Sequence, residues 1–275
     1  GFLEKECALA VKNGTLSETD IDNSVHRILK QVSRAVKILK IPVSCDYDAH
    51  RAVAREAAEA GVVLLKNEDA ILPLDGDTKI AVIGAMAKSM RYQGAGSSHV
   101  NPRKLDRPID FLPGAIYAPG CDDRGDTTDV LIAEAANAAK QAEVVVVFAG
   151  LPDRYESEGF DRDNMKMPES HVRLIKAVAQ ANANTVVVLL CGSAVECPWA
   201  DKVKAVLYMG LPGEAGGEAI ANLLYGKVNP SGKLAESWPY TYEDVPSAAV
   251  YGKMKDALYV EGIYAGYRYY DKSGV

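Results

Sequence analysis

The sequence predicts an α/β fold in which a mostly parallel sheet carries helices on both faces. Short apolar runs rich in β-branched residues recur at 80–83, 144–148 and 185–190. Runs of this kind are typical of strands that are buried on both faces. Helical patterns separate these runs, and a repeated strand–helix–strand order builds a parallel sheet between layers of helices.

The first 40 residues are predicted to be helical without a strand of their own. Ser17 stands three residues before Asp20, as in a capping box. Apolar residues then repeat at helical spacing: Ile21, Val25, Ile28, Leu29, Val32 and Val36. Because a helix must bury such a stripe, we expect 1–40 to form the edge of another domain, with 41–50 as a linker.

From residue 50 onward, helices and strands are expected to alternate. The expected helices are 50–60, one capped by Asp126 or Thr127 and running to 142, one from Pro168 to 182, and 213–225. The expected strands are 62–65, 80–84, 115–117, 144–148, 185–190 and 203–209. Gly216 and Gly217 should let the last helix pack tightly on the sheet. Residues 227–275 are expected to be mostly irregular.

Composition and charge narrow the class of protein. The chain has 275 residues, of which 48% are apolar and 25% charged, which is the range of globular proteins. Its net charge of −6 argues against a nucleic-acid partner or an anionic membrane surface, because no basic surplus exists to neutralise phosphates. No apolar run reaches the 18 residues that a membrane span needs. The chain begins at Gly1 rather than Met, so we expect it to be a piece of a longer protein.

The cysteines and histidines do not indicate a disulfide framework or a metal site. The five cysteines are odd in number and form no CxxC pair, which favours a reducing, cytoplasmic compartment. The four histidines lack metal-binding spacing, so no metal and no cofactor are expected.

The strongest candidate for chemistry is the acidic loop Tyr155–Arg162, which follows the 144–148 strand. It lies at the carboxyl end of a predicted parallel strand, where α/β sheets place their ligands. It carries Glu156, Glu158 and Asp161 beside Arg162. Neighbouring charges can push carboxyl pKa values apart, which suits general acid–base work. The competing interpretation is a solvated charged loop.

Two other motifs give weaker indications. The segment Gly94–Ser98 is rich in glycine but lacks the GxxxxGK[ST] pattern of a phosphate-binding loop. It is read either as a loop whose backbone approaches a ligand or as a flexible turn. Ser193 is not in a GxSxG elbow, and no histidine follows His171, so a serine hydrolase is disfavoured.

Taken together, these segments resemble glycoside hydrolase family 3, the β-glucosidase family. The resemblance runs through 20–29, 54–58, 63–68, 72–74, 80–84, 92–98, 158–162, 184–189, 230–234 and 261–270. It is spread over nearly the whole chain. Each piece is weak alone, whereas all of them in this order are a strong signal.

The resemblance implies a domain order. Family members combine a (β/α)8 barrel, an α/β sandwich and often a fibronectin-type domain. Residues 1–40 then resemble the last helical part of the barrel, 41–50 the linker, 51–245 the sandwich and 246–275 the approach to a third domain.

The resemblance also implies a retaining mechanism with two carboxyl groups. A barrel aspartate would attack the anomeric carbon, and a sandwich glutamate would protonate the leaving oxygen. The nucleophile motif Ser/Thr-Asp-Trp is not in this sequence, so this chain alone should be inactive. Glu158 matches the family's general acid/base, with Glu156 as the alternative.

Further site residues follow from the same resemblance. Asp161 and Arg162 are expected to pair and hold the loop, or else to contact sugar hydroxyls. Gln93, Ser97 and Ser98 are candidates to line the cleft. A general acid would need a raised pKa.

The expected partners are a β-glucoside or oligosaccharide, the parent's barrel domain, and a second copy of the chain through apolar surface left bare by the missing barrel. Two other functions stay open: a non-catalytic carbohydrate-binding or interaction module, and a nucleotide-binding α/β protein.

Overall fold

The computed structural model describes residues 2–42 and 44–275. Gly1, and Val43 of the expected linker, lie outside the described residues. The chain divides into two compact units, Gly1–Tyr47 and Asp48–Val275.

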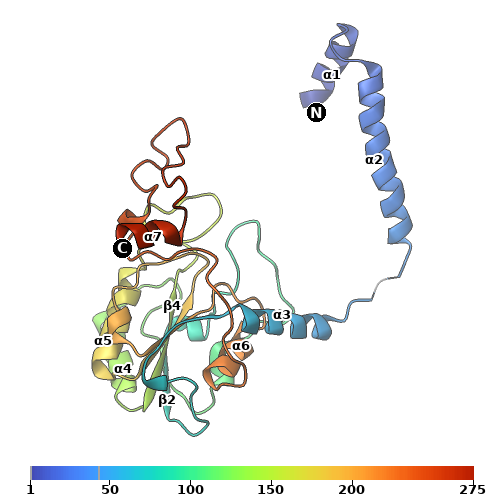
Figure 1. Ribbon diagram of the computed structural model, residues 1–275. Coiled ribbons are helices and arrows are strands. Elements are labelled where there is room, and N and C mark those ends of the chain that lie inside the picture. The colour runs from blue at the N-terminus through green and yellow to red at the C-terminus, as the bar shows by residue number, and fades with distance from the viewer. Residues whose placement is uncertain (1, 43) are drawn as a thin grey trace. The chain divides into compact units, whose positions relative to one another are not determined.

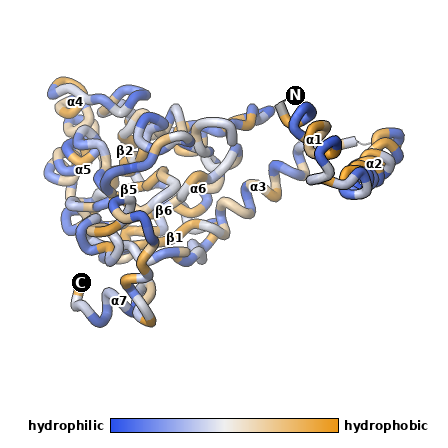
Figure 2. Tube along the Cα trace, turned by 90° about the horizontal axis from the view of Figure 1, so that it is seen from above, coloured by the Kyte–Doolittle hydropathy of each residue, from blue (hydrophilic) through white to orange (hydrophobic). Residues whose placement is uncertain are grey.

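The first unit consists of helices α1 (Phe2–Lys12) and α2 (Glu18–Leu39). Ser17 caps the start of α2 as predicted, because Asp20 N donates to Ser17 Oγ at 3.1 Å. The Asp20 carboxylate accepts from the Ser17 hydroxyl at 2.7 Å, which differs from the backbone contact of a full capping box. The apolar stripe of α2 stays uncovered: Val25 is 44% exposed and Ile28 62%. Figure 2 shows orange, hydrophobic stretches alternating with blue ones along α2.

The second unit is built on one six-stranded sheet. Its strands are β1 (Val63–Asn67), β2 (Ile80–Ile83), β3 (Ile116–Ala118), β4 (Val144–Gly150), β5 (Thr185–Leu190) and β6 (Ala205–Tyr208). They lie in the order β1-β6-β5-β4-β2-β3. All neighbours are parallel except β1, which runs antiparallel to β6. The predicted mostly parallel sheet is therefore confirmed.

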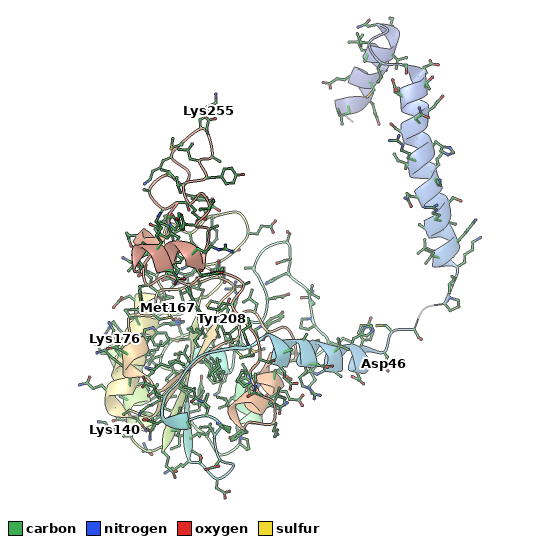
Figure 3. The ribbon with its side chains drawn as sticks, viewed as in Figure 1. Asp46, Lys140, Met167, Lys176, Tyr208 and Lys255 are labelled. Atoms are coloured by element: carbon green, nitrogen blue, oxygen red, sulfur yellow. The ribbon has the colours of Figure 1, made fainter. Side chains whose placement is uncertain are left out.

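Helices cover both faces of this sheet, as predicted. The helices of the unit are α3 (Tyr47–Gly61), α4 (Asp129–Ala139), α5 (Glu169–Ala181), α6 (Gly216–Leu224) and α7 (Tyr267–Ser273). Figure 1 shows α4 and α5 on one side of the strands and α6 on the other. Lys140 and Lys176 point from the α4 and α5 layer into solvent (Figure 3).

Alternate strand residues build two hydrophobic cores, because successive side chains of a strand point to opposite faces. Val145 and Val147 pack with Ile175 of α5 in one core. Val146 packs with Ile220 of α6 in the other.

Close packing of α6 explains its paired glycines. A Cβ on Gly217 would lie 2.7 Å from Asp106 Cβ, so any larger residue would push α6 from its neighbour. The predicted close approach is confirmed, but at these glycines it is made to residues 106–108, Pro212 and Met90 rather than to the sheet.

Several element ends differ from the prediction. Helix α4 is capped by Thr128, whose Oγ1 accepts from Leu131 N, and begins later than expected. The two expected caps are used elsewhere, since Asp126 pairs with Arg154 and Thr127 Oγ1 donates to Gly120 O. Helix α3 begins at Tyr47 rather than residue 50, and α7 lies in the tail expected to be mostly irregular. Across the described residues, no helix is long and apolar enough for a membrane span.

Candidate active site

Two loops meet at the carboxyl edge of the sheet. Residues 151–163 follow β4, and residues 91–100 come after its neighbour β2. After β2, the chain adds β3 on one side of β2 and then β4 on the other side, so the strand order reverses between β2 and β4. Open α/β sheets bind ligands at such a topological switch point, and these two loops flank it. The loops are joined directly, because Glu158 N donates to Ala95 O at 3.1 Å.

Glu158 is an exposed carboxylate held by one residue of the opposite loop. Ser97 donates to Glu158 Oε2 twice, from its backbone N at 2.6 Å and from its hydroxyl. The loop can approach this closely because residue 96 is a glycine with φ +104°, and a Cβ there would lie 2.5 Å from Glu158 Cβ.

The Ser97 hydrogen bonds stabilise the charged form of Glu158 and lower its pKa, the hydroxyl contributing most. A general acid at neutral pH needs the opposite shift. In this chain the carboxyl group is exposed, so the burial that could raise its pKa would have to come from another surface.

Replacing Ser97 by Ala should raise the pKa of Glu158 in this chain. The variant keeps the backbone donor and removes the hydroxyl, which is the larger cause of the lowered pKa. A carboxyl ¹³C NMR titration would measure this directly, with Ser98→Ala as the control. An unchanged Glu158 midpoint in Ser97→Ala would contradict the described hydrogen bond.

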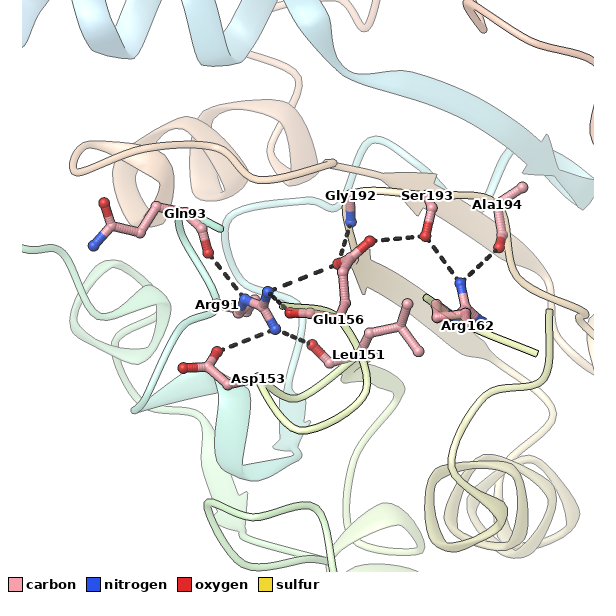
Figure 4. Close-up of polar contacts among 9 residues, drawn as sticks. All are labelled: Arg91, Gln93, Leu151, Asp153, Glu156, Arg162, Gly192, Ser193 and Ala194. Atoms are coloured by element: carbon pink, nitrogen blue, oxygen red, sulfur yellow. Dashed lines mark hydrogen bonds and ion pairs between the residues drawn. The ribbon is translucent and has the colours of Figure 1, made fainter. Parts of the chain in front are cut away.

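Glu156, the alternative acid, is occupied by structural contacts. Its carboxylate accepts from Gly192 N at 2.9 Å and from Ser193 Oγ at 2.7 Å. It also lies 3.8 Å from the Nη2 atom of Arg91. Figure 4 shows these contacts tying the loop to the turn after β5.

Arg162 holds the far end of the same loop. Its guanidinium donates to Ser193 Oγ at 2.9 Å, to Ala194 O at 3.3 Å and to Lys166 O at 3.2 Å. Across the described residues no ion pair joins it to Asp161, so the expected pairing is wrong. The reason is that the guanidinium turns inward toward backbone carbonyls, whereas Asp161 stays exposed.

The remaining candidates belong to the 91–100 loop. Gln93 braces that loop, since its amide donates to Val100 O at 3.0 Å and accepts from Val100 N at 2.9 Å. Ser98 Oγ would lie 3.1 Å from a Cβ on Gly94. The loop is therefore internally bonded rather than a plain flexible turn.

The sequence reasoning missed Arg91 and Ser193. Apart from the bond from Arg91 to Gln93 O, their contacts are with residues distant in the sequence, and no local pattern marks them. It also missed a cavity of about 740 Å³, lined by residues after β2, β3 and β4, including Tyr92, Cys121 and His171. Glu158 and Ser97 do not line it. In the described part of the chain, no three side chains are grouped as metal ligands.

Comparison with known proteins agrees with this architecture. A family model for the Glycosyl hydrolase family 3 C-terminal domain matches residues 62–267. The whole chain aligns with 38% of thermostable beta-glucosidase B of Acetivibrio thermocellus at 48% identity. It is also 41% identical, over 99% of its length, to 38% of an exo-alpha-(1->6)-L-arabinopyranosidase of Bifidobacterium longum.

Solved structures give the same result. The chain superposes over its full length on 42% of the GH3 beta-glucosidase of Bifidobacterium adolescentis, with a TM-score of 0.91 and 40% identity. It covers 43% of beta-glucosidase 3B of Thermotoga neapolitana at a TM-score of 0.81 and 31% identity. The chain thus spans about two fifths of the length of each of these four relatives. It belongs to glycosyl hydrolase family 3 and carries that family's C-terminal domain.

Proposed function

We propose that this chain supplies the general acid/base of a retaining glycosidase that removes terminal non-reducing β-D-glucosyl residues. A barrel domain of the parent protein supplies the nucleophile, because the chain lacks the nucleophile motif. The observation that carries the proposal is the state of Glu158. Its carboxylate is exposed at the carboxyl edge of the sheet and is bonded only through Ser97 among the contacts described.

We infer two roles for Glu158, one in each step of the reaction. Docking of the barrel would bury Glu158, which raises its pKa so that it can hand a proton to the glycosidic oxygen. The same group, then ionised, would take a proton from the water that hydrolyses the glycosyl–enzyme ester. Ser97 favours the ionised state and so assists the second step.

The sugar itself is a separate question, because one relative is named an arabinopyranosidase. We place glucose first since the two solved relatives described above are named beta-glucosidases. A p-nitrophenyl α-L-arabinopyranoside control tests the other specificity.

Azide rescue of Glu158→Ala in the parent enzyme tests the proposal. The variant should form the glycosyl–enzyme from an activated aryl β-glucoside but hydrolyse it slowly, because no base activates water. Azide needs no deprotonation: it attacks the anomeric carbon, the bond to the enzyme carboxylate breaks, and β-glucosyl azide is released. Failure of rescue, or formation of the α-azide, would count against the assigned role and the retaining course.

A further inference from the structure

Arg91 places a buried guanidinium where the 91–100 loop and the 151–163 loop begin. Only 6% of it is exposed. It donates from Nε to Gln93 O at 2.9 Å, from Nη1 to Leu151 O at 2.7 Å and from Nη2 to Glu156 O at 2.8 Å. Nη1 also lies 3.1 Å from Asp153 Oδ1. These contacts bind the 91–93 segment to residues 151–156 (Figure 4).

The fork of an arginine is needed for this set of partners. A guanidinium carries five N–H donors in a fixed plane. The three carbonyls, Asp153 and the Glu156 carboxylate provide five acceptor groups around it. A lysine would keep the charge but bring three donors at one point, so it could not span both loops.

Glu156 and Arg162 continue the attachment beyond Arg91. Both bond to the hydroxyl of Ser193 in the turn after β5, from opposite sides. The loop is thus fixed on either side of Glu158, at position 156 and at position 162. Between these points, the described contacts of Glu158 are those with Ala95 and Ser97.

We propose that Arg91, Glu156 and Arg162 form an anchor that positions the Glu158 carboxylate for proton transfer. The inference rests on the proposed function. Glu156 is then a positioning residue, and its charge serves Gly192 N, Ser193 Oγ and Arg91 rather than the substrate. Loss of the anchor leaves the fold's strands in place but displaces Glu158 from the leaving oxygen.

The test uses Arg91→Lys and Glu156→Gln in the full-length parent enzyme. A misplaced acid slows cleavage most for substrates with poor leaving groups, because good leaving groups need little protonation. The ratio of kcat/KM for methyl β-D-glucoside to kcat/KM for 2,4-dinitrophenyl β-D-glucoside should fall about tenfold or more, since small misplacements of catalytic groups carry effects of this size. Arg173→Lys, in an exposed ion pair with Asp129, should leave the ratio unchanged.

A second comparison separates positioning from general damage to the fold. In a Glu158→Gln background, Arg91→Lys should not lower the ratio further, because it acts through the missing acid. A merely structural effect would lower kcat/KM for both substrates equally, or would lower the ratio further in the Glu158→Gln background. Either result overturns the proposal. Ser193→Ala is a milder variant that should move the ratio the same way if Arg91→Lys fails to fold.

The two proposals fail in different ways. A wild-type parent that hydrolyses no glycoside would overturn the proposed function. An active parent whose substrate ratio is unaffected by Arg91→Lys, Glu156→Gln and Ser193→Ala would overturn only the anchor.

Discussion

Replacing Glu158 by Gln in the parent enzyme should reduce kcat/KM for methyl β-D-glucoside by about 10²- to 10⁴-fold, which is the usual contribution of general acid–base catalysis. For 2,4-dinitrophenyl β-D-glucoside the loss should stay within about tenfold, because that leaving group departs without a proton. The constant kcat/KM reports the steps up to the first irreversible one, here cleavage of the glycosidic bond, and so isolates the acid role.

Initial rates on the two substrates measure this effect, with Glu143→Gln as the control. Glu143 is an exposed glutamate in the turn before β4, away from the loop. Equal losses on both substrates would argue against an acid role for Glu158.

Replacing Gly150 by Ala should destabilise the chain by more than about 3 kcal/mol, the upper end of what overpacking costs. Gly150 ends β4 and pairs with Leu190 of β5. An added Cβ would lie 1.9 Å from the Leu190 carbonyl oxygen and 2.6 Å from its carbon. The neighbouring atoms are backbone at the centre of the sheet, so they cannot move aside without breaking strand pairing.

Urea unfolding of the purified chain, followed by circular dichroism, would measure the change. Gly76→Ala is the matched control, because nothing lies within 4 Å of a Cβ there; its stability should stay within about 0.5 kcal/mol of wild type. A Gly150→Ala midpoint equal to wild type would show that β4 and β5 pair differently. The expected loss is large beside a typical total stability of about 5–15 kcal/mol.

The fold was predictable because its strongest signals are local. Runs such as 144–148 and 186–190 are apolar throughout and rich in β-branched residues, which is typical of strands covered on both faces. The Glu158 loop was likewise located from the strand before it and from the family resemblance. The ends of helices were less predictable: Thr128 caps α4, whereas the expected cap Asp126 pairs with Arg154, a residue 28 positions along the chain.

The roles within the loop could not be read from its residue types. Glu156 and Glu158 are equivalent in sequence, two positions apart on one loop. They differ in their hydrogen-bond donors: the Glu156 carboxylate accepts from the turn at 192–193, and the Glu158 carboxylate accepts from Ser97. Arg91 gave no sequence signal because three of its partners are backbone carbonyls, which every residue carries.

The lowered pKa of Glu158 fits a divided active site. A carboxylate that is exposed and hydrogen-bonded by Ser97 is a ready base but a poor acid at neutral pH. The proposed acid function would therefore require a second surface that removes water from this loop. The exposed apolar stripe of α2 is a separate indication that this helix packs against another apolar surface.

The most direct test is to assay this purified chain and its full-length parent side by side on p-nitrophenyl β-D-glucoside. Turnover by the parent alone, with none by the chain at equal molar concentration, is the predicted result, because the barrel supplies the nucleophile and the chain supplies Glu158. Turnover by the isolated chain would mean that a nucleophile lies within these 275 residues, and it would contradict the assignment of roles.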